Sequence, residues 1–271
     1  MFKYFLIAGV FALIGCNTQK NSTELTSTHA VNYQPTVLTT WQWQLQGDLN
    51  TEYNAANFDI DLFDTSQSEI TQLQQQGKKV ICYFSAGSYE NWREDATDFD
   101  QSNLGATLDG WVGEKWLDIR STSVRNIMEQ RIQLASDKGC DAVEPDNIDG
   151  YTNNTSFNLS ADDQLSFNIF LADTAHRHNM AIALKNDLSQ VSQLVRYFDF
   201  AVNEQCYEFD ECHLLKPFTA AGKAVLHVEY AQKYVDEPHT RQTLCNDTLA
   251  LKFSTLVLPL ALDDRFRYSC F

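Results

Sequence analysis

Groups that bind metal ions are scarce in this sequence. None of its six histidines is spaced as a zinc ligand, and its seven cysteines include no pair separated by two residues. We therefore expect no metal and no other cofactor. Positive charge is also scarce, with 20 Lys and Arg against 36 Asp and Glu and a net charge of −16. This charge argues against nucleic-acid partners and favours a cationic or neutral ligand, although an acidic surface also keeps exported proteins soluble.

The N-terminus carries an apolar run, residues 5–13, that is too short to cross a bilayer. Lys3 precedes this run and Leu13-Ile14-Gly15-Cys16 ends it, which is the pattern of a bacterial lipoprotein signal. We expect residues 1–15 to be removed, Cys16 to be lipidated, and residues 16–35 to form a polar tether. An ordinary secretory signal is the alternative. Both interpretations place the protein outside the cytoplasm, in the cell envelope, with the lipid anchor as its contact with the membrane.

Six cysteines remain once Cys16 is set aside, an even number that favours disulfides in an oxidising compartment. We expect bridges between Cys206 and Cys212 and between Cys245 and Cys270. For Cys82 and Cys140, a third bridge and two buried free thiols both remain open.

The remaining chain predicts one TIM-like (β/α)8 barrel, spanning residues 36–271, without a second domain. The chain without its signal is about 255 residues long, the usual size of that fold, and strand-like and helix-like segments alternate along it. The predicted helices begin at Ser121 or Thr122 and at Ser160, and glycines end helices at Gly77, Gly139 and Gly222. The strand-like segments include 58–64, 80–87, 116–120, 141–143, 183–187, 200–206 and 228–230.

Carboxylates recur where these strand-like segments end. Asp146 follows the apolar stretch 141–143, and Glu204 follows 200–202. In α/β barrels the loops after the strands carry the catalytic groups, so we take Asp146 and Glu204 as the candidate catalytic pair. Any single acid at such a position can instead cap a helix or accept bonds from nearby backbone N–H groups.

A series of short motifs, in order from Trp41 to Tyr230, resembles glycoside hydrolase family 114. They are Trp43-Gln44-Leu45, Asp59-Ile60-Asp61, Cys82-Tyr83-Phe84-Ser85-Ala86-Gly87-Ser88, Glu90 with Trp92-Arg93, Trp116-Leu117-Asp118-Ile119-Arg120, Glu144-Pro145-Asp146-Asn147, Lys185-Asn186-Asp187, Asn203-Glu204-Gln205-Cys206 and Val228-Glu229-Tyr230. The resemblance implies a TIM-barrel-like endo-α-1,4-polygalactosaminidase. Its substrate would be an α-1,4-linked polymer of galactosamine and N-acetylgalactosamine, and we expect a monomer.

The resemblance also implies that Asp146 and Glu204 carry the reaction. We assign Asp146 as nucleophile and Glu204 as acid/base, which requires a retaining enzyme with carboxyl groups about 5–5.5 Å apart. An acidic cleft would attract the ammonium groups of a deacetylated polymer. The candidate substrate-binding residues are Asp61, Tyr83, Glu144, Asn147, Tyr151, Lys185, Asp187, Glu229 and Tyr230. For the acids among them, tuning of the catalytic pair and ion pairing with Lys185 or Arg120 are alternatives, and for Lys185 a structural ion pair is the simplest role.

Two other functions remain possible from the sequence. One is a surface lipoprotein that binds polysaccharide without cleaving it, which predicts loss of one of the two carboxylates, and neither is lost here. The other is a hydrolase of a different extracellular glycan, because loops set sugar specificity.

The lipoprotein signal predicts that Cys16→Ser yields an unlipidated protein that is still active, since the anchor and tether lie outside the barrel. Metabolic labelling with a palmitate analogue checks this. Label retained on the substituted protein would contradict lipidation at Cys16.

Overall fold

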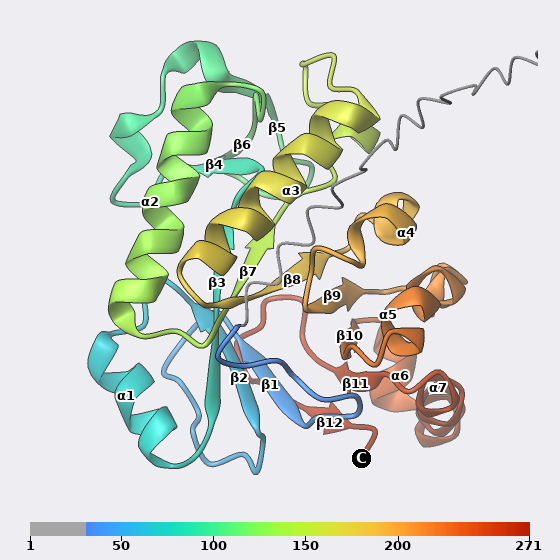
Figure 1. The fold of residues 1–271 in the computed structure, drawn as a ribbon. Coiled ribbons are helices and arrows are strands. Elements are labelled where there is room, and N and C mark those ends of the chain that lie inside the picture. The colour runs from blue at the N-terminus through green and yellow to red at the C-terminus, as the bar shows by residue number, and fades with distance from the viewer. Residues whose placement is uncertain (1–30) are drawn as a thin grey trace, which may run out of the picture.

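The computed structural model describes residues 31–271, in which a parallel sheet curls into a TIM-like (β/α)8 barrel (Figure 1). The nine-stranded sheet has eight parallel strands, and its last strand runs antiparallel to its neighbour. In spatial order the strands are β1 (Trp41–Gln44), β2 (Asn57–Asp61), β3 (Lys79–Ser85), β7 (Ala142–Asp146), β8 (Ala181–Lys185), β9 (Phe200–Glu204), β10 (Val225–Glu229), β11 (Ser254–Val257) and β12 (Tyr268–Ser269). The barrel predicted from the sequence is confirmed.

Side chains connect β1 and β11, which are the first and last of the parallel strands. Trp41 Nε1 donates a hydrogen bond of 2.8 Å to the Ser254 carbonyl, and Ser254 Oγ donates one of 2.7 Å to the Thr39 carbonyl. Arg267, next to β12, donates to the Trp41 carbonyl at 2.8 Å. These bonds connect the two edges of the sheet.

Helices cover the outside of the barrel, except at two of the connections after its strands. They are α1 (Gln67–Gln75), α2 (Thr122–Lys138), α3 (Ala161–Arg177), α4 (Val191–Leu194), α5 (Lys216–Ala220), α6 (Gln232–Asp236) and α7 (Pro238–Ala250). Ser121 precedes α2, Ser160 closes a capping box at α3, and Gly139 ends α2 with φ of 88°, as the sequence predicted. In the described chain no helix lies between β1 and β2, and β12 follows β11 where an eighth helix would stand.

An insertion between β3 and α2 forms a separate antiparallel sheet. Its strands are β4 (Ser88–Glu90), β5 (Leu104–Thr107) and β6 (Glu114–Leu117), paired in the order β4-β6-β5. The prediction that residues 116–120 form a barrel strand was therefore wrong: Trp116 and Leu117 belong to β6, and residues 118–120 lead into α2. Leu117 N–H bonds to Gly87 at 2.9 Å and Ala106 N–H bonds to Thr155 at 3.0 Å, which fix the insertion above the ends of β3 and β7 (Figure 1).

Residues 31–35, predicted as the end of the tether, contact the barrel. Val31 packs against the apolar barrel interior, the Tyr33 hydroxyl bonds to Asn57, and Gln34 bonds to the Asp199 carbonyl at 3.0 Å. These residues therefore belong to the folded domain. The predicted signal, Cys16 and the rest of the tether lie outside the described residues, and the described part contains no helix long and apolar enough to span a membrane.

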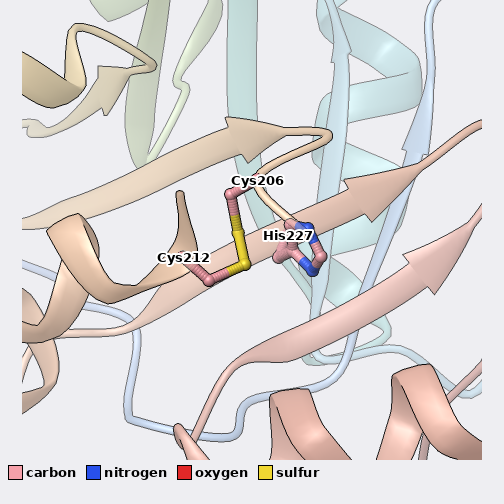
Figure 2. A group of neighbouring side chains, drawn as sticks. All are labelled: Cys206, Cys212 and His227. Carbon is pink, nitrogen blue, oxygen red and sulfur yellow. A yellow bond between two sulfur atoms is a disulfide. The ribbon is translucent and has the colours of Figure 1, made fainter. Parts of the chain in front are cut away.

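Three disulfides link the six remaining cysteines. Cys206–Cys212 and Cys245–Cys270 confirm the two expected bridges, and Figure 2 shows the first of them beside His227. Cys82–Cys140 is a third bridge, so these cysteines are not free thiols. It joins β3 to the turn before β7 across 58 residues and closes off the whole segment that contains the insertion and α2.

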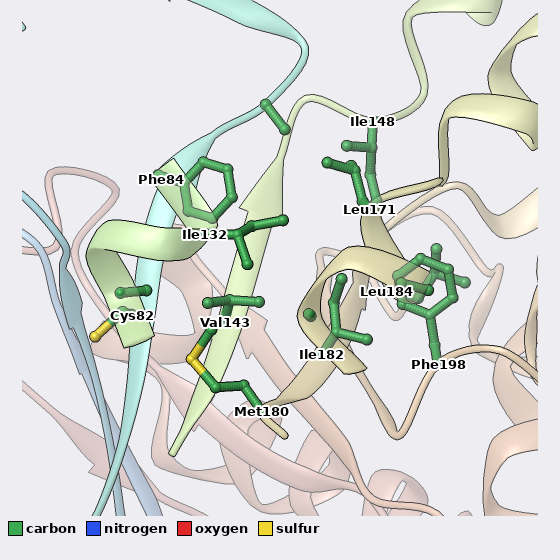
Figure 3. Packing of buried hydrophobic residues seen from close by; sticks show 14 of the residues in the cluster. Cys82, Phe84, Ile132, Val143, Ile148, Leu171, Met180, Ile182, Leu184 and Phe198 are labelled. Carbon is green, nitrogen blue, oxygen red and sulfur yellow. The ribbon is translucent and has the colours of Figure 1, made fainter. Parts of the chain in front are cut away.

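Alternate residues of each strand face two different cores. Val143, Ile182 and Leu184 pack outward against α2 and α3, as Figure 3 shows around Ile132 and Leu171. Their neighbours in the strands belong to a second cluster inside the barrel, which includes Trp41, Trp43, Ile81, Ala142, Ala181, Ala183, Phe200, Val202, Leu226 and Val228. The inward-facing positions of β7, β8 and β9 continue from these apolar residues to Asp146, Lys185 and Glu204 at the strand ends.

Candidate active site

Lys185 connects the two predicted catalytic carboxylates. Its Nζ lies 2.9 Å from Asp146 Oδ1 and 3.2 Å from Glu204 Oε2, and these residues end the adjacent strands β7, β8 and β9. The Lys185 side chain is 1% exposed, whereas those of Asp146 and Glu204 are 18% and 26% exposed. The ammonium group therefore lies beneath two carboxylates that remain open to solvent.

Burial by itself would lower the pKa of Lys185. The nearby carboxylates of Asp146, Glu204 and Glu144 more than offset this effect and raise the pKa well above its usual range. Lys185 is therefore charged near neutral pH, and it contacts both acids at once.

Two tyrosines bind the carboxylate oxygens on the other side. The Tyr83 hydroxyl donates to Asp146 Oδ2 at 2.9 Å, and the Tyr230 hydroxyl donates to Glu204 Oε1 at 2.5 Å. Burial, reinforced by the neighbouring carboxylates, raises the pKa of both tyrosines, so both remain neutral donors. Each acid thus has one oxygen facing Lys185 and the other facing a phenol.

A second pair of acids lies below Lys185. Glu144 Oε1 is 3.4 Å from Lys185 Nζ, and Asp59 on β2 is within hydrogen-bonding reach of Glu144. Both side chains are fully buried, and apart from these contacts their oxygens have no hydrogen-bond partner among the described residues. Burial, and then the charge of Glu144, raises the pKa of Asp59 well above its usual range, while burial raises that of Glu144 to about 7. The Asp59 carboxyl group therefore stays protonated to a higher pH than usual, and in this form it can donate a hydrogen bond to Glu144.

The backbone turns sharply after each of the three strands. Asn147, Asn186, Asp187 and Gln205 all have φ between 41° and 61°, a conformation that non-glycine residues rarely adopt. Such strained positions concentrate at functional sites. Here they follow directly after Asp146, Lys185 and Glu204 and redirect the chain out of the barrel.

Gly87 permits a close approach to the loop after Asp146. A Cβ at this position would lie 1.7 Å from the Asn147 carbonyl oxygen, so no side chain fits. The N–H groups of Ala86 and Gly87 both donate to the Asp146 carbonyl, at 2.9 and 3.1 Å. The glycine in the Ser-Ala-Gly-Ser motif therefore fixes the backbone of a candidate catalytic residue.

A cavity of about 560 Å³ opens above these groups. This volume lies in the usual range of ligand sites, about 300–1,000 Å³. Its acidic residues are Asp109, Glu114, Asp146, Asp149 and Glu204, and Lys185 is the one basic residue among the described residues that line it. Burial raises the pKa of Glu114 to about 7 and that of Asp149 to about 6.

The structure brings seven of the eleven predicted catalytic and substrate-binding residues to this cavity or directly beneath it. Asp146, Glu204, Lys185, Tyr83, Tyr230 and Asn147 line it, and Glu144 contacts Lys185 from below. Sequence reasoning missed Asp149, Asn186, Glu114 and Asp109. Asn186 lies within the motif Lys185-Asn186-Asp187 and Asp149 lies two residues after the motif that ends at Asn147, whereas nothing in the sequence placed Glu114 and Asp109 near the barrel strands.

Seven predicted residues thus lie at the cavity, and the other four have different partners. Asp61 is buried and makes a double ion pair with Arg93, at 3.0 and 2.7 Å. Glu229 is fully buried and bonds to His227 at 2.9 Å. Neither lines the cavity, so the prediction that they contact substrate gives way to the alternative of a structural role: an ion pair with Arg93 for Asp61 and a hydrogen bond with His227 for Glu229, instead of contacts with Lys185 and Arg120.

Asp187 and Tyr151 lie behind the cavity wall. Asp187 is 3% exposed and accepts a bond of 2.9 Å from Asn168, and burial raises its pKa to about 8. Tyr151 is half-buried and interacts with Asp187. These two residues therefore support the loops after β7 and β8.

One group in the described part of the chain has the spacing of metal ligands. The ligand atoms of Cys206, Cys212 and His227 lie within 4.8 Å of one another (Figure 2). The two cysteines are joined in a disulfide, however, and so offer no thiolate to a metal.

Comparison with known proteins identifies the family. The model of glycoside hydrolase family GH114 matches residues 22–270. The chain belongs to this family. It is therefore a glycoside hydrolase of the endo-α-1,4-polygalactosaminidase family, and the resemblance found in the sequence motifs is confirmed.

Solved structures agree with this family assignment. The crystal structure of Ega3 from Aspergillus fumigatus in complex with galactosamine is 42% identical, with a TM-score of 0.85, and the match covers 89% of this chain and 98% of Ega3. The glycoside hydrolase domain of PelA from Pseudomonas aeruginosa is 12% identical with a TM-score of 0.66, covering 83% of this chain and 96% of that domain, and so supports the fold alone. No match to a curated protein sequence was found.

The buried acid pair of this GH114 protein predicts how its stability depends on pH. Asp59 ionises near pH 3.9 in an unfolded chain but keeps its proton to a much higher pH in the fold. Between the pKa values of Asp59 in the unfolded and the folded state, the folded state binds more protons. The free energy of unfolding therefore falls as the pH rises through this range. Asp59→Asn keeps a hydrogen-bond donor toward Glu144 and removes the titration. The variant should match the unsubstituted protein near pH 4 and become more stable than it at higher pH, by up to about 1.4 kcal/mol per pH unit.

Urea unfolding at pH 4 and pH 7 measures this difference. Asp98→Asn, the same change at an exposed position of the insertion, is the control and should show no such dependence on pH. A variant at Asp59 that is less stable than the unsubstituted protein at pH 7 would show that Asp59 acts as an anion.

Proposed function

We propose that the protein is an extracytoplasmic endo-α-1,4-polygalactosaminidase that hydrolyses α-1,4-linked galactosamine and N-acetylgalactosamine polymers with retention of configuration. The observation that carries the proposal is the contact of Asp146 and Glu204 with one buried lysine at the mouth of the barrel. This arrangement provides the two carboxyl groups that glycoside hydrolysis requires, one on each side of a reacting bond.

The spacing of the pair supports a retaining mechanism. Because Asp146 Oδ1 and Glu204 Oε2 lie 2.9 and 3.2 Å from the same nitrogen, they cannot be more than about 6 Å apart. Retaining enzymes hold their carboxyl groups about 5–5.5 Å apart, whereas inverting enzymes need about 6.5–9.5 Å to admit a water molecule.

The contacts of Asp146 and the exposure of Glu204 support the assigned roles. Asp146 receives bonds from Lys185, Tyr83 and its neighbouring Asn147 N–H at 2.7 Å, which stabilise a carboxylate and suit a nucleophile. Glu204 is the more exposed of the two, at 26%, so a leaving group and water can both reach it. In the proposed reaction Asp146 attacks the anomeric carbon while Glu204 protonates the leaving oxygen. Glu204 then deprotonates the water that releases the sugar from Asp146.

The charge of the cavity supports a cationic polymer as substrate. Five acidic residues and one lysine line it, and the lysine is occupied by Asp146, Glu204 and Glu144. Galactosamine units that have lost their acetyl groups carry ammonium groups near neutral pH, which such a cavity attracts over a distance set by ionic strength. The solved Ega3 complex contains galactosamine. An anchor at Cys16 would hold the enzyme at the envelope, in contact with extracellular polysaccharide.

Product analysis tests the proposed substrate. The purified protein should release oligosaccharides from partly deacetylated α-1,4-galactosaminan and none from unrelated polysaccharides, as read by mass spectrometry. The rate should fall as salt is added, because the attraction between ammonium groups and the cavity is screened. Cleavage of another glycan, with galactosaminan left intact, would assign a different linkage to this site.

Substitutions of the two acids distinguish their roles. Asp146→Asn should reduce turnover of every substrate by several orders of magnitude, because no glycosyl-enzyme can form. Glu204→Gln should also abolish cleavage of the polymer, but an α-galactosaminide with a good leaving group needs less acid assistance. Azide needs no general base, so it should restore turnover of that activated substrate by Glu204→Gln and give an α-configured glycosyl azide.

Exposed acids provide matched controls. Asp98→Asn and Glu211→Gln make the same chemical changes outside the cavity and should retain full activity. Azide rescue with retained stereochemistry in Asp146→Asn would mean that the roles are reversed. Near-normal activity in both catalytic variants would mean that the site lies elsewhere.

A further inference from the structure

Exposed apolar side chains gather on the insertion above the barrel. Seven large apolar side chains are exposed in the described part of the chain, and three of them, Trp92, Trp111 and Val112, lie in or beside the strands β4 and β6. Single exposed apolar residues are ordinary, but an exposed aromatic side chain that lines a ligand cavity is a candidate contact for the ligand. Trp111 is 47% exposed and lines the cavity that contains Asp146 and Glu204, whereas Trp92 and Val112 do not line it.

The turn that carries Trp111 is held in one conformation. Trp111 N–H donates to Leu108 at 3.2 Å, and the Trp111 carbonyl accepts from Glu114 N–H at 3.3 Å. Gly113 has φ of 98°, and a Cβ there would lie 2.8 Å from Asn91 Oδ1, so the turn packs directly on the chain after β4. The tryptophan is therefore presented at the cavity by a fixed support, which limits the entropy lost on binding.

The surroundings of Trp111 suit an amino sugar. Asp109, two residues earlier in the same turn, is exposed and also lines the cavity. An indole ring can pack on the C–H groups of a sugar ring and attract an adjacent ammonium group. A neighbouring carboxylate, here that of Asp109, can form an ion pair with the same ammonium group. The exposed side chain of Leu260 lines the same cavity from the loop after β11.

We propose that Trp111 and Asp109 form a distal subsite that binds a galactosamine unit of the polymer away from the bond being cleaved. This inference rests on the proposed function, since its ligand is a further unit of the same substrate. The subsite would give the enzyme its preference for polymers over short substrates, because binding energy from a remote unit is available only to a chain long enough to reach it.

Kinetics on two substrates test the subsite. Trp111→Ala should raise the KM for soluble galactosaminan about tenfold, equivalent to ~1.4 kcal/mol, with little change in kcat. Turnover of an activated α-galactosaminide monosaccharide should not change, because a single sugar bound at Asp146 and Glu204 leaves the proposed distal subsite empty. Trp111→Phe keeps an aromatic face and should raise the KM by no more than about threefold. Val112→Ala, at the next position in the same turn but outside the cavity, is the control and should leave both substrates unaffected.

Affinity electrophoresis in gels containing galactosaminan measures the subsite without turnover. The polymer should retard the unsubstituted protein and Val112→Ala more than Trp111→Ala, and Asp109→Asn should lose retardation most with fully deacetylated polymer. Equal retardation of all four proteins would overturn the inference. An equal loss of catalytic efficiency by Trp111→Ala on the polymer and on the monosaccharide would also overturn it. If the unsubstituted protein cleaves neither substrate, the proposed function fails, while retardation still decides whether Trp111 binds the polymer.

Discussion

A buried ammonium group, that of Lys185, is the constraint on which the active site depends. A lysine that is 1% exposed is stable only because three carboxylates lie within 3.4 Å of its nitrogen. Two of these, Asp146 and Glu204, are the acids to which we assign the reaction, and the third, Glu144, is shielded from solvent. Removing the lysine would leave like charges close together and unpaired, so the same interaction stabilises the barrel mouth and keeps the reacting groups in place.

The barrel makes this arrangement possible through the geometry of its strands. Inward-facing positions are apolar in the lower part of β7, β8 and β9 and become charged at the carboxyl ends, so the charged residues rest on a packed apolar core. Asn147, Asn186 and Gln205 then adopt a left-handed backbone conformation. Each of them turns the chain out of the barrel directly after Asp146, Lys185 or Glu204. These turns are supported from below, because β7, β8 and β9 each have a neighbouring strand on both sides in the sheet.

Much of this organisation was predictable from the sequence, because it follows from local patterns. The barrel, the helix boundaries at Ser160 and Gly139, and the acids at the ends of β7 and β9 all follow from alternation, capping and strand-end rules. The same rules failed for Trp116, because a strand of an antiparallel insertion has the same local pattern as a barrel strand. They also failed for Glu229, which follows Val228 on the opposite face of β10 and so points away from the barrel interior toward His227. Which cation an acid will meet, Arg93 for Asp61 or Lys185 for Asp146, is decided by contacts between distant segments that a local pattern does not contain.

In the proposed enzyme, the catalytic centre and the distal subsite lie on different parts of the structure. Asp146, Lys185 and Glu204 are fixed by neighbouring strands and change only if the barrel changes. The wall formed by Asp109, Trp111 and Glu114 belongs instead to the small antiparallel sheet of the insertion, outside the barrel strands. A loop of this kind can vary in sequence without disturbing the buried lysine beneath it, since it contributes no ligand to that group. Recognition of distal sugar units can therefore change while the reaction at the barrel mouth stays the same.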